Sequence, residues 1–118
     1  MEFVGVSKLR IADPSGSESP QYGDLLDLPD HVVGEIVGGQ LYVNPRPAAP
    51  HARASSILGT EITGPFDRGR GGPGGWWVLF EPELHLGPDV LVPDLVRMAR
   101  ERMPTIPDVA FFEIRVIE

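Results

Sequence analysis

The sequence of 118 residues contains no cysteine. Disulfide scaffolds, thiol nucleophiles and zinc sites with thiolate ligands are therefore excluded, and the composition is compatible with a reducing compartment. Long hydrophobic runs are also absent, since the longest extends only from Trp76 to Phe80, whereas a membrane-spanning helix needs about 20 apolar residues. The N-terminus lacks the basic start and apolar segment of a signal peptide. These absences predict a cytoplasmic protein without a membrane span.

Positive charge is scarce in this chain. It has 10 basic and 17 acidic residues, a formal net charge of −7, and Lys8 is its one lysine. Non-specific attachment to nucleic acid depends on many Lys and Arg residues that displace counterions from phosphates. Any contact with nucleic acid must therefore be local or mediated by a metal ion.

Proline and glycine, by contrast, are abundant, with 13 and 14 residues, or 27 of 118. This share lies just under the ~25–30% at which low-complexity disorder becomes the better interpretation. One ordered domain with many loops is predicted. Residues 1–23 are polar and rich in turn formers, so we expect a mobile N-terminal tail there, followed by a domain over residues 24–118.

The first half of this domain contains a hairpin and a helix. Residues 34–37 and 40–43 are β-prone and flank Gly38-Gly39, which favours a tight turn because glycine readily adopts positive φ. A short helix is expected over residues 24–28. A longer helix is expected from His51 until Gly64-Pro65, with one apolar face formed by Ala54, Ile57, Leu58 and Ile62.

The second half is rich in β-structure. Residues 76–86 are apolar at even positions, which predicts one long strand with Glu81, Glu83 and His85 on its wet face. Residues 89–96 are apolar on both faces, as in a buried central strand. Residues 109–118 alternate again. The whole pattern predicts an α/β domain.

Two carboxylates lie at positions where the sequence pattern is otherwise apolar. Asp94 interrupts the buried strand, where an ionised group is costly unless a cation or strong donors meet it. Glu118 has the same parity as the apolar positions Ala110, Phe112, Ile114 and Val116. Asp94 and Glu118, with a water-accessible Glu83 or Glu35 nearby, would form an oxygen-rich site suited to Mg²⁺. Such an ion activates water for hydrolysis of a phosphodiester.

Three blocks occur in a characteristic order: GEIVGGQL at residues 34–41, PRPAAPH at residues 45–51 and VPDLV at residues 92–96. In this order they resemble the Uma-two type restriction endonuclease family of the PD-(D/E)XK nuclease superfamily. The resemblance covers roughly residues 25–118. It implies a restriction-endonuclease-like α/β core with a mixed central sheet, Mg²⁺ as the cofactor and DNA as the substrate.

The resemblance also implies roles for individual residues. Glu35 matches the first acidic residue of the family, His51 the histidine between loop and helix, and Asp94 the aspartate of the PD element. Glu118 matches the glutamate of a Val-x-Glu strand. The predicted catalytic set is therefore Glu35, Asp94 and Glu118, with Asp94 and Glu118 as metal ligands.

The sequence departs from the family in two respects. It stops at Glu118, where the family continues, which indicates an N-terminal part of an incomplete nuclease domain. A second alignment takes Glu113-Ile114-Arg115 as the (D/E)xK element, with arginine in place of lysine. Arginine does not readily release a proton, and no other lysine is available than Lys8. Endonuclease activity is therefore expected to be weak or absent.

Other interpretations remain open for the same residues. Asp94 could simply be a turn residue after Pro93, and Glu118 a solvated terminal residue. Arg97, Arg100 and Arg102 form a basic cluster that either meets phosphate or is merely solvated. A rival function is a non-catalytic interaction module that forms a homodimer or binds a partner, because residues 110–118 would leave an open strand edge.

Overall fold

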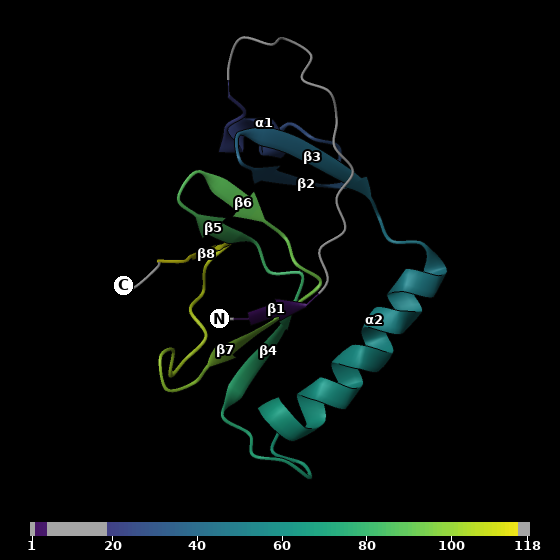
Figure 1. The fold of residues 1–118 in the computed structure, drawn as a ribbon, viewed down its shortest axis with the longest axis vertical. Helices are drawn as coiled ribbons and strands as arrows, with labels where there is room; N and C mark the ends of the chain where they lie inside the picture. The colour runs from purple at the N-terminus through teal and green to yellow at the C-terminus, as the bar shows by residue number, and fades with distance from the viewer. Residues whose placement is uncertain (1, 5–18, 116–118) are drawn as a thin grey trace. The chain divides into compact units, whose positions relative to one another are not determined.

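The computed structural model describes residues 2–4 and 19–115 (Figure 1). The chain divides into two compact units, each with its own β-sheet, and each unit is described by itself. Unit 1 contains the described residues of Met1–Gly5, Pro47–Pro82 and Pro93–Val109, and unit 2 contains those of Val6–Arg46, Glu83–Val92 and Ala110–Glu118.

The first described element of unit 2 is the short helix α1 (Tyr22–Leu26), which starts two residues earlier than expected. The start is fixed across the first turn, because the Gln21 backbone N–H donates to the Asp24 carboxylate at 2.7 Å and the Asp24 N–H donates to the Gln21 backbone carbonyl. The predicted hairpin follows as β2 (Val32–Val37) and β3 (Gln40–Pro45).

The hairpin turn is the tight two-residue type that the glycine pair predicts. Val37 pairs with Gln40, and φ is 59° at Gly38 and 75° at Gly39. Positive φ at both central residues matches the right-handed twist of the flanking strands, and glycine adopts it without steric cost. The Gly38 N–H also donates to the Asp89 carboxylate at 3.0 Å.

The remaining strands of unit 2 are β6 (Asp89–Leu91), β5 (Leu84–Leu86) and β8 (Phe112–Glu113). The sheet has the order β3-β2-β6-β5-β8, which Figure 1 shows as one strand below the next. Only β8 runs parallel to its neighbour, β5, so this five-stranded sheet is mixed, as expected. Its core side chains are Ile36, Val43, Leu84 and Val90.

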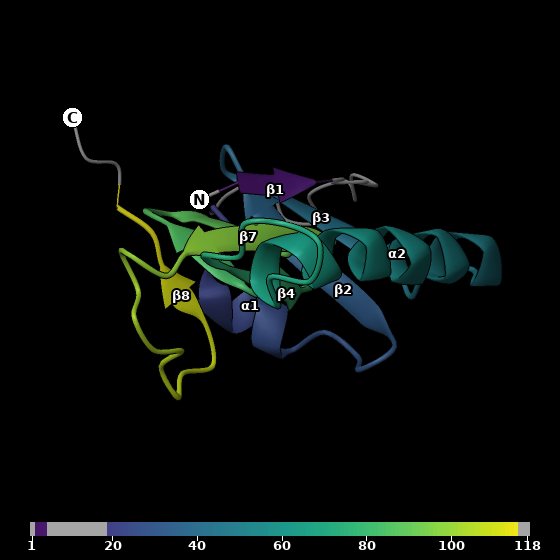
Figure 2. The same cartoon turned by 90° about the horizontal axis from the view of Figure 1, so that it is seen from below.

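Unit 1 contains a smaller antiparallel sheet of β1 (Glu2–Val4), β7 (Leu95–Ala99) and β4 (Trp76–Phe80). Figure 2 shows β7 between the other two strands. Leu95, Val96 and Met98 of β7 are buried, because a central strand is shielded along both edges. Of the expected tail, residues 2–4 thus pair with β7, and residues 5–18 lie outside the described part of the chain.

Beside this sheet lies the predicted helix, α2 (Ala49–Ile62), with a proline in its first turn, where no intrahelical N–H is needed. It does not end at Gly64-Pro65. It continues into the π-helix η1 (Thr63–Asp67), in which the Arg68 N–H donates to the Thr63 carbonyl five residues earlier. The wider turn accommodates Pro65, whose missing N–H would interrupt an α-helical ladder.

The apolar residues predicted to line one face of α2 do not form its buried side. Ile57 and Leu58 are 47% and 41% exposed, and within α2 the buried residue is Gly59. The ring of Phe80 lies against Gly59, where a methyl group would overlap it. The absence of a side chain at Gly59 thus decides which face of the helix approaches the strand.

Two strand predictions were also too long. Residues 76–86 form β4 and β5 in different sheets, and residues 89–96 form β6 and β7. The breaks fall at Pro82 and Pro93, because proline cannot donate to a ladder. The chain passes between the units at both prolines. No helix among the described residues is long and apolar enough to cross a membrane.

Candidate active site

Asp94 lies at the break between β6 and β7, directly after the buried Pro93, and not within a strand as expected. Its carbonyl accepts the Glu81 N–H at 3.1 Å, which ties this bend to the end of β4. Its side chain is 28% exposed. The bend therefore presents the carboxylate to water while the backbone around it is fixed.

His51, in the first turn of α2, comes close to this carboxylate. Its Nε2 atom lies 3.4 Å from Asp94 Oδ1, and its side chain is 43% exposed. The two residues are 43 positions apart in the sequence, so unit 1 brings together two side chains that the sequence analysis singled out separately. Protonation of the imidazole would make this contact an ion pair.

Asp94 also lines a cavity of about 250 Å³ within unit 1. Ser55 and Ser56 of α2 form one wall, and Phe80 and Glu81 contribute to another. The Ser56 hydroxyl donates to the Arg53 carbonyl at 2.9 Å. The cavity therefore combines carboxylates with hydroxyl groups beside an aromatic ring, a surface suited to hydrated or polar ligands.

Glu81 is a site residue that the sequence analysis placed only on a wet strand face. Its φ is 49°, the single positive value at a non-glycine residue in the described part of the chain. Such a conformation costs free energy for a residue with a Cβ and persists only when its surroundings hold it. The Glu81–Asp94 backbone hydrogen bond supplies that restraint, and the cavity receives a second carboxylate.

Glu35 lies in unit 2 and is 2% exposed, so the expectation that it is water-accessible was wrong. Its Oε2 atom accepts the Val92 N–H at 2.9 Å. That N–H lies just beyond the end of β6, where strand pairing has ended. The Glu35 carboxylate therefore supplies the hydrogen-bond acceptor for this backbone donor. Glu35 thereby fixes the backbone one residue before Pro93.

The other predicted acids have different outcomes. Glu118 lies outside the described residues, so the Asp94–Glu118 metal pair remains a prediction. Glu113, from the alternative alignment, is exposed on β8 opposite His85. Within residues 2–4 and 19–115, no three His, Asp or Glu side chains gather as a metal-binding group.

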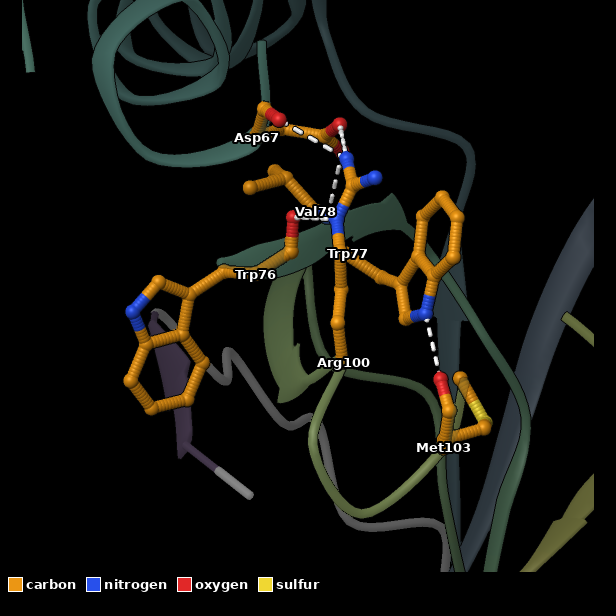
Figure 3. A network of polar contacts seen from close by, with 6 residues as sticks. All are labelled: Asp67, Trp76, Trp77, Val78, Arg100 and Met103. Atoms are coloured by element: carbon orange, nitrogen blue, oxygen red, sulfur yellow. Dashed lines mark hydrogen bonds and ion pairs between the residues drawn. The ribbon is translucent and has the colours of Figure 1, made fainter. Parts of the chain in front are cut away.

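A polar network holds the far end of η1 to the sheet of unit 1 (Figure 3). The Asp67 carboxylate accepts the Val78 N–H at 2.8 Å and Arg100 Nη2 at 2.6 Å. The Arg100 guanidinium lies 3.8 Å from the centre of the Trp77 ring, whose Nε1 donates to the Met103 carbonyl at 2.7 Å. Arg100 is therefore a structural residue and not a free member of a basic cluster.

A second network, in unit 2, joins residues expected merely to face water. Glu83 Oε2 accepts the Tyr22 hydroxyl at 2.8 Å and lies 2.9 Å from His85 Nε2. The His85 ring stacks on Phe111 at 3.8 Å. The hydrogen bond to Glu83 raises the pKa of Tyr22, and burial and the charge of Glu83 act in the same direction. Glu83 directly precedes β5 and His85 lies within it, and this spacing of two residues in extended chain is the signal that places them together.

Comparisons with known proteins bear on the fold. No family model and no curated protein matches the sequence. A crystal structure from Anabaena variabilis, described as "a putative nuclease belonging to DUF820", matches with a TM-score of 0.61 and 20% identity. The match covers 79% of this chain and 52% of the other, so the chain spans about half the length of that protein. The two share a mixed α/β fold, as the sequence analysis expected.

Proposed function

We propose that this chain forms part of a Mg²⁺-dependent DNA endonuclease of the PD-(D/E)XK type, with Asp94 as its central acidic residue. The observation that carries the proposal is the Asp94 carboxylate, which follows a buried proline and faces a cavity beside His51. The fold shared with a protein described as a nuclease supports it. A DNA substrate and a cytoplasmic location belong to the same proposal.

Each candidate residue has a separate role in this proposal. Asp94 and Glu118 hold the metal ion, since carboxylate oxygens are the ligands that Mg²⁺ prefers. When bound, Mg²⁺ supplies charge stabilisation for the phosphodiester and a more acidic water molecule. His51 is a positioning residue, because its Nε2 atom restricts the Asp94 carboxylate. Glu35 secures the Val92 backbone that leads to Pro93 and Asp94.

We expect low activity from the 118-residue chain. Its single lysine, Lys8, lies far along the sequence from the predicted acids. Loss of one electrostatic contributor to a transition state commonly lowers the rate by ~10²–10³. The activity should therefore become measurable only at high protein concentration.

Nicking of supercoiled plasmid tests the proposal. Purified chain with Mg²⁺ should nick DNA slowly, EDTA should stop the reaction, and Asp94→Asn should abolish it. Asp108→Asn is the matched control, because Asp108 lies on an exposed loop of the same unit. Nicking that survives in Asp94→Asn, or that falls equally in both variants, would overturn the role of Asp94.

A second candidate function, partner binding through an open strand edge, is favoured by the place of β8. This strand is the last in the five-stranded sheet. The Phe112 N–H donates to the Glu83 carbonyl just before β5 and the Ile114 N–H to the His85 carbonyl, so the Glu113 N–H between them points to the open side. Glu113→Pro removes that donor without removing a bond to β5. If the edge forms a homodimer, light scattering should show a dimer for the native chain and a monomer for Glu113→Pro.

A further inference from the structure

A second cavity of unit 1 lies at the C-terminal end of α2 and has a volume of about 360 Å³. The helix and η1 contribute Thr60, Thr63 and Gly64 to its lining, and the glycine-rich loop that follows contributes Arg68 and Arg70. No acidic side chain is among the described residues that line it. This local composition is the reverse of the whole chain, which carries a formal charge of −7.

The two arginines of this cavity differ from Arg100 nearby in the sequence. Arg100 is committed to Asp67 and to the Trp77 ring. Arg68 and Arg70 are exposed, and within the described part of the chain their guanidinium groups have no hydrogen-bond or ion-pair partner. The loop holds them in place through its backbone, because the Arg68 N–H donates to the Thr63 carbonyl and the Arg70 N–H to the Gly64 carbonyl.

Thr63 supplies a third unsatisfied group. Its hydroxyl oxygen is buried and has no hydrogen-bond partner among the described residues. An unpaired buried hydroxyl is costly, and because this oxygen is shielded from solvent, it donates to a ligand in the cavity once the Thr63 side chain rotates toward it. Thr63 is also the first residue of η1, and single π-turns are frequently found at functional sites.

We propose that this cavity binds a backbone phosphate of nucleic acid, through Arg68 and Arg70 as charged donors and the Thr63 hydroxyl as a neutral donor. Paired guanidinium groups match the oxygens of a phosphate, and charge-assisted hydrogen bonds are stronger than neutral ones. The choice of nucleic acid as the source of the phosphate rests on the proposed nuclease function. The cavity would give an acidic chain the local contact with DNA that diffuse charge cannot provide.

The position of this cavity relative to Asp94 fits a single bound strand. Phe80 lines both cavities, and α2 contributes residues to both between Ala52 and Thr60 before η1 continues the wall to Gly64. The two linings are therefore adjacent along one helix, and a single strand bound across Phe80 can contact both cavities.

The salt dependence of DNA binding tests this proposal. Anisotropy of a labelled 16-base-pair duplex is measured in EDTA, which prevents cleavage, between 50 and 200 mM KCl. Each phosphate contact contributes about −0.9 to the slope of log K against log[KCl]. Because both arginines contact one phosphate, the double variant Arg68→Gln/Arg70→Gln should have a slope about 0.9 less negative than that of the native chain. The native chain should lose about 3.5-fold more affinity across this salt range than the double variant.

Matched control variants distinguish the effect of this site on DNA binding from the effect of overall charge. Arg53→Gln/Arg102→Gln removes the same charge outside the cavity and should keep the native slope. Thr63→Val should weaken binding at every salt concentration without a change in slope. Equal slopes for the two double variants would overturn the proposal, as would a native chain that fails to bind DNA.

Two further arms identify the ligand and separate the two proposals. Inorganic phosphate, at constant ionic strength, should displace DNA from the native chain, and binding of phosphate without binding of DNA would overturn the nucleic-acid assignment. If the native chain binds the duplex with the expected slope and Asp94→Asn nicks plasmid as fast as the native chain, the nuclease proposal fails while the phosphate site stands.

Discussion

The Arg100 guanidinium is fixed from two sides, since its Nη2 atom lies 2.6 Å from Asp67 Oδ1 and its carbon lies 3.8 Å from the centre of the Trp77 ring. The same Nη2 atom also donates to the Asp67 carbonyl at 2.7 Å. This pair joins the end of η1 to the strand β4 and the segment after β7 (Figure 3). The planar guanidinium serves both contacts, which an ammonium group cannot reproduce.

Arg100→Lys should therefore destabilise the protein although the charge is kept. Asp67 is 15% exposed and Arg100 37%, so solvent screens part of the interaction and we expect a loss of about 1–2 kcal/mol in the free energy of unfolding. Urea denaturation measures it. Arg102→Lys, on an exposed position two residues further, is the control and should change the free energy of unfolding little. Equal losses in the two variants would show that the pair contributes nothing specific.

Gly59→Ala should destabilise the native chain, although alanine is the better helix former. A methyl group at residue 59 would overlap the Phe80 ring, which must then move away from the helix. In a Phe80→Ala background the obstacle is gone, and Gly59→Ala should then stabilise by about 1 kcal/mol. A double-mutant cycle from urea denaturation measures the coupling. No coupling between the two positions would contradict the packing of Phe80 on Gly59.

Glu81→Gly should stabilise the protein and lower any nuclease activity. Glycine adopts the φ of 49° at this position without the Cβ penalty, which favours the folded state by about 1 kcal/mol. The variant also removes a carboxylate from the cavity of Asp94. Thermal unfolding and plasmid nicking measure the two effects. Glu81→Gln keeps the strain, so it should reduce nicking without stabilising the fold.

Tyr22 should titrate above the ordinary tyrosine pKa of about 10, because the hydrogen bond to Glu83 raises its pKa. A raised pKa in the folded state means that the neutral phenol is favoured by folding. This contribution to stability is fully present below the pKa of the unfolded chain and is lost as the pH rises through the folded pKa. Absorbance titration of tyrosinate measures the Tyr22 pKa, and the Tyr22→Phe variant identifies the signal of Tyr42. Glu83→Gln should lower the Tyr22 pKa toward 10. An unchanged Tyr22 pKa in that variant would assign the shift to another cause.

Mg²⁺ should stabilise the chain through Asp94 and Glu118. A ligand at about a hundred times its dissociation constant adds ~2.7 kcal/mol to the free energy of unfolding. Melting with and without millimolar Mg²⁺ should show a shift for the native chain that Asp94→Asn and Glu118→Gln both lose. A shift that is the same in all three chains, or absent from all three, would exclude a metal site at this pair.

The sequence by itself determined the local structure of this protein. The hairpin of β2 and β3 follows from Gly38-Gly39, and the start of α2 follows from the proline-rich segment before His51. The mixed sheet was implied by the family resemblance, and the alternation over residues 110–118 predicted an edge strand, of which the structure describes β8. These features depend on φ, on hydrogen-bond donors and on side-chain parity, which neighbouring residues fix.

Only the tertiary structure decided the side-chain partners. It placed His51 beside Asp94, buried Glu35 at the end of β6, and committed Arg100 to Asp67, whereas Arg68 and Arg70 have no side-chain partner among the described residues. No local rule could assign these outcomes, because each depends on which residues distant in the sequence share a neighbourhood. The chemical role of a carboxylate or guanidinium depends on the protein groups that take the place of its hydrating water. The tertiary structure brings those groups to it.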